Sequence, residues 1–252
     1  MPAAPEARRR PPVLPGAGLL LWAAATLAAI AGSLSMQDMG ELPMPGGWTL
    51  STAWMPMCGQ SWAGAAASFT GMWVVMMVAM MSPSVLPALR EYRPRLATVA
   101  GAGYFFVWAV LGAIIFALGA LLTQVLLQMN TVARAVPALS GLIVLLAGAF
   151  QFTAWKAHHL NCCRQQAAQL PTHAGTAWRH GLRLGVHCIC SCASLTALLL
   201  VLGVMDLRVM AMVTAAITAE RLAPDGDRVA RAAGAVAIVA GLLISARALW
   251  PA

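Results

Sequence analysis

The sequence is short of charged residues. Only 10% of its 252 residues are Asp, Glu, Lys or Arg, while 60% are hydrophobic and the mean hydropathy is +0.77. A soluble domain usually has about a quarter of its residues charged, so an ordinary soluble domain is excluded. The sequence predicts an all-α, polytopic integral membrane protein whose helices form one bundle in a lipid bilayer.

The sequence also lacks the motifs of several enzyme classes. We find no Ser/His/Asp arrangement, no carboxylate pair and no glycine-rich phosphate loop, so hydrolysis and phosphoryl transfer have no support. The formal net charge of +8 comes from basic residues that lie between apolar runs, a pattern that indicates membrane topology and no nucleic-acid partner. We therefore predict a protein that is not an enzyme.

Apolar runs predict about seven transmembrane helices. They cover residues 17–34, 62–89, 99–122, 136–155, 181–205, 209–219 and 229–249. The sixth run is too short to span a bilayer alone, so a bundle of six is the alternative. Residues 1–16 form a basic N-terminal segment ahead of a single transmembrane domain, residues 17–252. The first run has no convincing A-x-A cleavage site and is about long enough to span a bilayer, which favours an uncleaved helix over a signal peptide.

The distribution of Lys and Arg predicts the orientation of these helices. With the N-terminus inside, 13 of the 16 basic residues fall on inner segments, and only Arg134, Arg208 and Arg247 fall on outer ones. Basic residues accumulate in cytoplasmic loops, so we expect a multi-pass protein of the bacterial cytoplasmic (inner) membrane with a cytoplasmic N-terminus. Residues 35–60 then form an outer loop, and residues 156–180 form an inner loop.

Three cysteines and a histidine, in the motif HCICSC, lie within the apolar run 181–205. Ionisable groups at membrane depth usually mark a functional path, and soft transition metals prefer thiolate and imidazole ligands. Cys188 and Cys192 share one helix face, whereas His187 and Cys190 are offset. Either the Cys188 and Cys192 pair binds metal with ligands from another helix, or the helix is irregular. The alternative to a metal site is that these cysteines only pack.

A second group of metal-ligand residues lies at the start of the inner loop, in KAHHLNCC. His158 and Cys162 are four residues apart, as are His159 and Cys163, so one helical turn presents each pair on one face. Two histidines and two cysteines within six residues favour a metal site over an interfacial loop with unrelated side chains.

Methionine is frequent in the outer loop and in the second apolar run. The loop has no Lys or Arg, and a thioether binds Cu(I) without deprotonation. In the second run, methionines at i, i+4 spacing form a ladder about 12 Å long. Both groups suit either a metal relay or simple packing. The relay candidates are Met72, Met76, Met80, Met77, Met81, Met36, Met39, Met44, Met57 and Cys58.

Four motifs occur in the order seen in a bacterial family of predicted metal-binding integral membrane proteins: MMVAMMSPSVLP, AGAFQFTAWKAHHLNCCR, GVHCICSCASL and GVMDLRVMAMVTAAITAER. The chain resembles this family over roughly residues 62–245. The family includes a membrane-bound copper chaperone associated with a tyrosinase. The resemblance implies copper delivery to a cuproenzyme such as a tyrosinase or a terminal oxidase, and the thiolate and thioether ligands favour copper in the form of Cu(I). The matching positions are Met76, Met77, Met80, Met81, Pro83, Gln151, Lys156, Cys163, Arg164, Cys188, Cys192, Met205 and Glu220.

The chain departs from the family pattern at two places. His159 stands where a cysteine is expected, and Cys190, Ser191, Cys192 and Ala193 replace the Gly-Cys-Cys-Trp of many relatives. Both changes affect the number and geometry of metal ligands.

Three functions remain open. A membrane-bound copper chaperone, with Cys188, Cys192, Cys163 and His159 as the main site, is favoured. A copper or transition-metal transporter is the alternative, although the sequence has no nucleotide-binding motif and no inverted repeat. A thiol–disulfide oxidoreductase is less favoured, because the sequence lacks C-x-x-C spacing.

Overall fold

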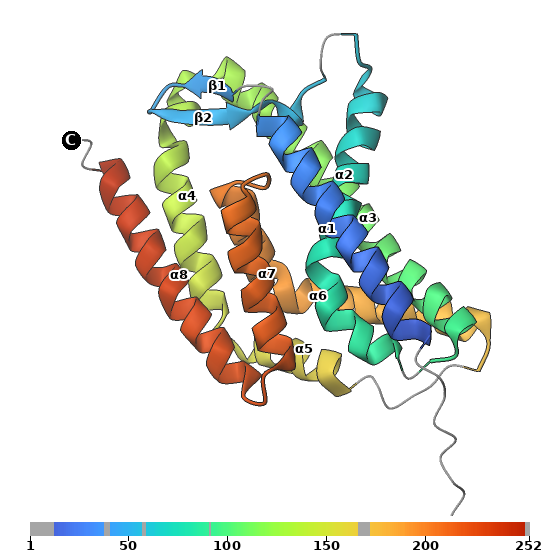
Figure 1. The fold of residues 1–252 in the computed structure, drawn as a ribbon. Helices are drawn as coiled ribbons and strands as arrows, with labels where there is room; N and C mark the ends of the chain where they lie inside the picture. The colour runs from blue at the N-terminus through green and yellow to red at the C-terminus, as the bar shows by residue number, and fades with distance from the viewer. Residues whose placement is uncertain (1–12, 38–40, 57–58, 91, 166–171, 250–252) are drawn as a thin grey trace, which may run out of the picture.

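The computed structural model is a helical bundle with a small two-stranded hairpin at one end (Figure 1). It describes residues 13–37, 41–56, 59–90, 92–165 and 172–249. The elements in order are α1 (Val13–Gln37), β1 (Glu41–Met44), β2 (Trp48–Ser51), a 3₁₀ turn (Thr52–Trp54), α2 (Trp62–Leu89), α3 (Pro94–Gln128), α4 (Asn130–Phe150), α5 (Ala154–Gln165), α6 (Ala174–Leu202), α7 (Leu207–Leu222) and α8 (Gly226–Leu249).

Six helices among the described residues are long and apolar enough to cross a membrane: α1, α2, α3, α4, α6 and α8. This confirms the predicted all-α membrane bundle. The short run 209–219 is helical, as α7, but it has 16 residues, fewer than the roughly 20 that a bilayer requires. Asp206 starts α7 early, because its carboxylate accepts hydrogen bonds from the backbone N–H groups of Arg208 and Val209.

Helix α2 continues through two prolines, Pro83 and Pro87, although proline usually kinks or ends a helix. Pro83 has no N–H group, so the carbonyl of Ala79 loses its partner within the helix. The indole Nε1 of Trp22, on α1, donates to this carbonyl at 3.0 Å. The neighbouring helix therefore satisfies the acceptor that Pro83 leaves open, and α2 ends only at Leu89.

Helix α6 contacts four other helices, α3, α4, α5 and α7. Glycines allow α3 and α6 to approach closely, since a Cβ added at Gly181 would overlap the carbonyl of Ala100, and one at Gly103 would come within 2.8 Å of the carbonyl of Trp178. Because this contact holds one face of α6 against α3, the other side of α6 is turned toward α2, α5 and α7.

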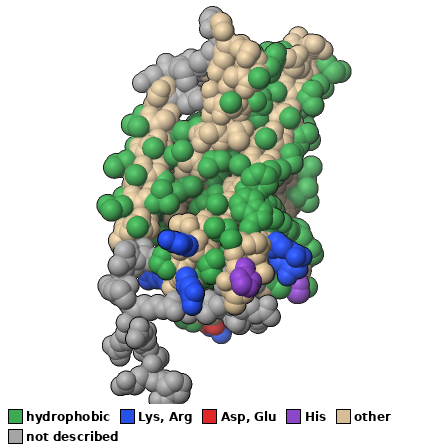
Figure 2. Space-filling view, turned by 90° about the vertical axis from the view of Figure 1, so that its right-hand side faces the viewer, with side chains coloured by type: hydrophobic (Ala, Val, Ile, Leu, Met, Phe, Trp, Pro, Cys, Tyr) green, Lys and Arg blue, Asp and Glu red, His purple; other side chains and the backbone are tan. Residues whose placement is uncertain are grey.

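The two ends of the bundle differ in polarity. Lys, Arg and His side chains gather at the lower end of a mostly hydrophobic face, the end where α5 lies (Figures 1 and 2). The hairpin lies at the opposite end (Figure 1). This separation matches the charge distribution used above to orient the chain.

The hairpin lies within the predicted outer loop, for which we predicted no strands. Strands β1 and β2 are antiparallel, with Met44 opposite Trp48, and Gly46 and Gly47 have positive φ angles in the turn. Each strand has only four residues, too few for an alternating pattern to stand out, and the Gly-Gly pair was the available signal. Met39, Met57, Cys58 and the side chain of Met36 lie outside the part of the chain that the structure describes.

Candidate metal centre

The two cysteines predicted to share a helix face are both buried. Cys188 and Cys192 are 0% and 1% exposed, whereas His187 and Cys190 on the same helix are partly exposed. Helix α6 is continuous through this stretch. The structure therefore excludes the irregular helix that was one of the two alternatives, and any further ligand of the buried pair has to come from another helix.

Cys163 of α5 lies beside this pair, and the guanidinium of Arg221 on α7 joins them. Arg221 Nη2 is 3.6 Å from Cys163 Sγ, 3.8 Å from Cys192 Sγ and 3.1 Å from the hydroxyl of Ser191. Ser191 Oγ lies 3.8 Å from Cys163 Sγ and 3.7 Å from Cys192 Sγ. We call Cys163, Cys188 and Cys192 the thiol cluster.

The charge of Arg221 favours thiolates in this cluster, because a nearby cation stabilises the deprotonated form. Burial raises the pKa of the Cys163 thiol above its ordinary value, and the Arg221 guanidinium opposes that rise. On its other side, Cys188 Sγ lies 2.9 Å from the phenol oxygen of Tyr104, on α3. Four helices thus surround the cluster.

A buried ion pair supports the cluster from α5 and α7. Lys156 Nζ donates to Glu220 Oε2 at 2.7 Å and to the carbonyl of Ser191 at 2.6 Å. Gln151 Nε2 donates to Glu220 Oε1 at 3.2 Å. Gln151 therefore makes an interhelical hydrogen bond, and Glu220 forms a salt bridge. The sequence places Lys156 among the basic residues and among the positions that match the family, but it does not indicate that Lys156 pairs with Glu220.

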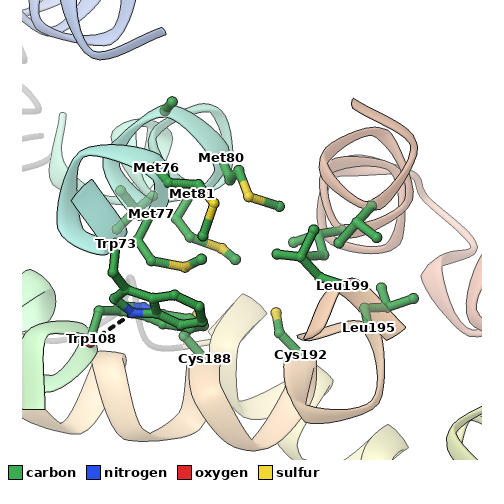
Figure 3. Packing of buried hydrophobic residues seen from close by; sticks show 14 of the residues in the cluster. Trp73, Met76, Met77, Met80, Met81, Trp108, Cys188, Cys192, Leu195 and Leu199 are labelled. Carbon is green, nitrogen blue, oxygen red and sulfur yellow. Dashed lines mark hydrogen bonds between the residues drawn. The ribbon is translucent and has the colours of Figure 1, made fainter. Parts of the chain in front are cut away.

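Methionines of α2 extend toward the same side of α6. Met76, Met77, Met80 and Met81 are at most 2% exposed, and Figure 3 shows their side chains between α2 and the α6 face that carries Cys188 and Cys192. The predicted ladder divides at Met72, which is partly exposed. The end of its side chain lies where a Cβ on Gly32 of α1 would be. Met44 lies in β1, at the hairpin end of the bundle.

The two i, i+4 pairs of α5 have different partners. His158 Nε2 lies 3.6 Å from Cys162 Sγ, as the spacing predicts. His159 instead meets α6, where its Nδ1 lies 3.1 Å from His187 Nδ1. Burial lowers the pKa of His159, with smaller contributions from the nearby His187 and His158. The structure therefore separates His159 from the thiol cluster with which we grouped it.

The same end of the bundle contains no disulfide among the described cysteines and has a cavity beside α5. The five cysteines that the structure describes are free thiols. Among the described residues, no three of the His, Cys, Asp and Glu side chains are arranged as a metal site. A cavity of about 280 Å³ lies between α5 and the start of α8, and its lining includes Lys156, Asp227 and Arg231 but none of the sulfur ligands.

Comparison with known families gives one match. The model of a family described as copper chaperone, PpoB2, matches residues 70–244, which include most of α2, the thiol cluster and Arg221. No curated protein and no solved structure matches the chain.

Proposed function

The chain belongs to the PpoB2 copper chaperone family, and we propose that it is a membrane-bound chaperone that holds Cu(I) in the thiol cluster and supplies it to a cuproenzyme. The observation that carries this proposal is the convergence of Cys163 and Cys192, from α5 and α6, on the guanidinium of Arg221.

The ligand chemistry supports Cu(I) as the cargo. Thiolates and thioethers are the side chains that this soft ion prefers, and Cys188 and Cys192 of the thiol cluster face the buried methionines of α2 (Figure 3). Two thiols that bind one Cu(I) release two protons and leave a complex with one negative charge. Arg221 compensates that charge inside the bundle, where an unpaired charge is costly. Two or three sulfur ligands also leave the ion exchangeable, as delivery requires.

The location of the cluster supports loading or release from the basic end of the bundle. Under the positive-inside rule, the α5 end faces the cytoplasm of a bacterial inner membrane. Cys163 is partly exposed on α5, whereas Cys188 and Cys192 lie deeper on α6. Of the three thiols, Cys163 is therefore the first that an ion entering at this end meets. A tyrosinase or a terminal oxidase is the class of recipient that we propose.

The test is an anaerobic Cu(I) titration of the detergent-purified protein. We expect the wild type and a Cys190→Ser control to bind copper, and a Cys188→Ser/Cys192→Ser variant to lose the sulfur-bound ion. Serine nearly preserves side-chain volume, and size-exclusion chromatography verifies that each variant remains folded. Sulfur-bound copper at the wild-type level in the double variant would falsify the proposal.

A transporter is the second candidate, and the position of the α2 methionines favours it. Their side chains lie between α2 and the α6 face that carries Cys188 and Cys192, and α2 itself packs against α1, which leads to the hairpin end. Uptake of Cu(I) into sealed vesicles containing the protein separates the two functions. A chaperone without transport activity leaves the vesicle interior free of copper, whereas a transporter fills it.

A further inference from the structure

Helices α5 and α6 meet at two successive contacts of different chemistry. His159 meets His187, and Cys163 meets Ser191, so both contacts join residues 28 apart in the sequence. The two helices therefore run parallel here, and the contacts are one helical turn apart, about 6 Å along the axis. One contact is made by imidazoles, and the next belongs to the thiol cluster.

The imidazole contact has further donors beside it. The ring of His158 lies 5.4 Å from that of His159, between centroids, and its Nε2 is 3.6 Å from Cys162 Sγ. We call His158, His159, Cys162 and His187 the histidine cluster. His158 is exposed and the other three are partly exposed, in contrast to the buried Cys188 and Cys192.

From this arrangement, and resting on the proposed function, we propose that the histidine cluster is a second Cu(I) site, held mainly by His159 and His187, which receives or releases the ion at the protein surface. The thiol cluster, one turn further along the same interface, is the storage site.

The geometry of the pair suits a two-coordinate ion. The two Nδ1 atoms are 3.1 Å apart and share one hydrogen when both rings are neutral. Metal–imidazole bonds are about 2.0 Å long, so an ion between the two nitrogens requires the rings to separate by about 1 Å. The shared hydrogen moves to Nε2 of its own ring, and no net proton is released.

The neighbouring groups favour exchange over tight retention. The edge of the Trp155 ring packs against His159, with centroids 4.3 Å apart, and limits where that imidazole can turn. Neutral imidazoles give a complex that keeps the positive charge of the ion, whereas the thiol cluster neutralises that charge. An ion at the histidine cluster is therefore drawn toward thiolates. The two sites are neighbours on both helices, because Cys162 directly precedes Cys163 on α5 and His187 directly precedes Cys188 on α6.

The test counts bound Cu(I) and identifies its ligands by X-ray absorption. Four proteins are compared: wild type, His159→Gln/His187→Gln, Cys163→Ser/Cys188→Ser/Cys192→Ser, and a His180→Ala control. His180 lies on α6, seven residues before His187, and packs on Tyr92. We expect two ions in wild type and control, one sulfur-bound ion in the histidine variant, and one nitrogen-bound ion in the thiol variant.

Two results would overturn the second site. One is a thiol variant that folds and binds no copper, and the other is a histidine variant with the same copper number and absorption spectrum as wild type. Neither result would contradict Cu(I) binding at the thiol cluster. A different result would contradict the proposed function itself: the wild type would then hold no sulfur-coordinated copper. If the histidine variant does not fold, stepwise titration of wild type decides: nitrogen scattering must appear with one of the two ions.

Discussion

The ammonium of Lys156 lies 2.7 Å from a carboxylate oxygen of Glu220, and both side chains are at most 2% exposed. The pair joins α5 to α7, and the bond from Lys156 to the carbonyl of Ser191 adds α6. These three helices carry Cys163, Cys192 and Arg221, so the ion pair links the helices that bring the thiols and the guanidinium together.

Loss of Lys156 should destabilise the bundle strongly. Lys156→Met leaves the Glu220 carboxylate buried without its counter-ion, and breaking a buried pair in this way costs about 3–5 kcal/mol. We expect a large fall in the midpoint of thermal unfolding in detergent. Lys156→Met/Glu220→Leu removes both charges and should recover most of the loss.

The matched control for this experiment is the exposed pair Arg228 and Asp225, whose side chains are 79% and 65% exposed and lie 3.1 Å apart. Arg228→Ala should change stability by only about 0–1 kcal/mol, because solvent screens the pair. A Lys156→Met protein as stable as Arg228→Ala would show that the buried pair does not hold the helices together.

Arg221 should strengthen Cu(I) binding through its charge. Arg221→Gln keeps hydrogen-bonding groups beside Ser191 but removes the cation beside the two thiols. Charge-assisted hydrogen bonds contribute about 1.5–3 kcal/mol, so we expect Cu(I) affinity to fall by roughly 10- to 100-fold, measured by competition with a coloured Cu(I) chelator. Arg231→Gln, on α8, is the control, and an equal loss in both variants would contradict a local effect.

Removal of the indole donor of Trp22 should destabilise α2. In Trp22→Phe the ring is largely preserved, but the Ala79 carbonyl, already without its helical partner because of Pro83, loses its remaining donor. An unsatisfied acceptor of this kind costs about 1–3 kcal/mol. Thermal unfolding in detergent measures the effect, and Trp62→Phe, at the exposed start of α2, is the control. Equal midpoints for the two variants would rule out this role of Trp22.

The helices were predictable where apolar runs end at clear signals. Residues 62–89 were predicted and found as α2, since the hydroxyl of Ser61 caps the start and Arg90 ends the run. Helix α3 is longer than its apolar run 99–122 at both ends. It begins at Pro94, because proline is a favourable first residue of a helix, and it continues to Gln128. Length and hydropathy therefore give the existence of a helix more reliably than its ends.

The candidate site was predictable only as far as one helix determines it. The 3.6-residue period places Cys188 and Cys192 on one face. It says nothing of Arg221 or Tyr104, which reach the cluster through the packing of α7 and α3. The period also places His159 and Cys163 on one face of α5, and both do meet α6. They do so one turn apart, so His159 meets His187 and Cys163 meets Ser191.

The affinity of the thiol cluster for Cu(I) should rise with pH. Copper binds the thiolate, so a thiol that is protonated in the free protein must release its proton, and affinity rises about tenfold per pH unit for each proton released. Burial raises the pKa of Cys163 above its ordinary value of 9.0. Below that raised pKa the thiol is protonated, so its contribution to the slope persists through pH 6–8. Competition titrations across this range, corrected for protonation of the chelator, measure it.

Cys163→Ser should remove one proton from that dependence and lower the slope by about one log unit per pH unit. Cys162→Ser is the matched control, because this neighbouring thiol faces His158 and not the thiol cluster. The control should keep the wild-type slope. An unchanged slope in Cys163→Ser would mean that Cys163 does not give up a proton to copper, and the cluster would then reduce to the pair on α6.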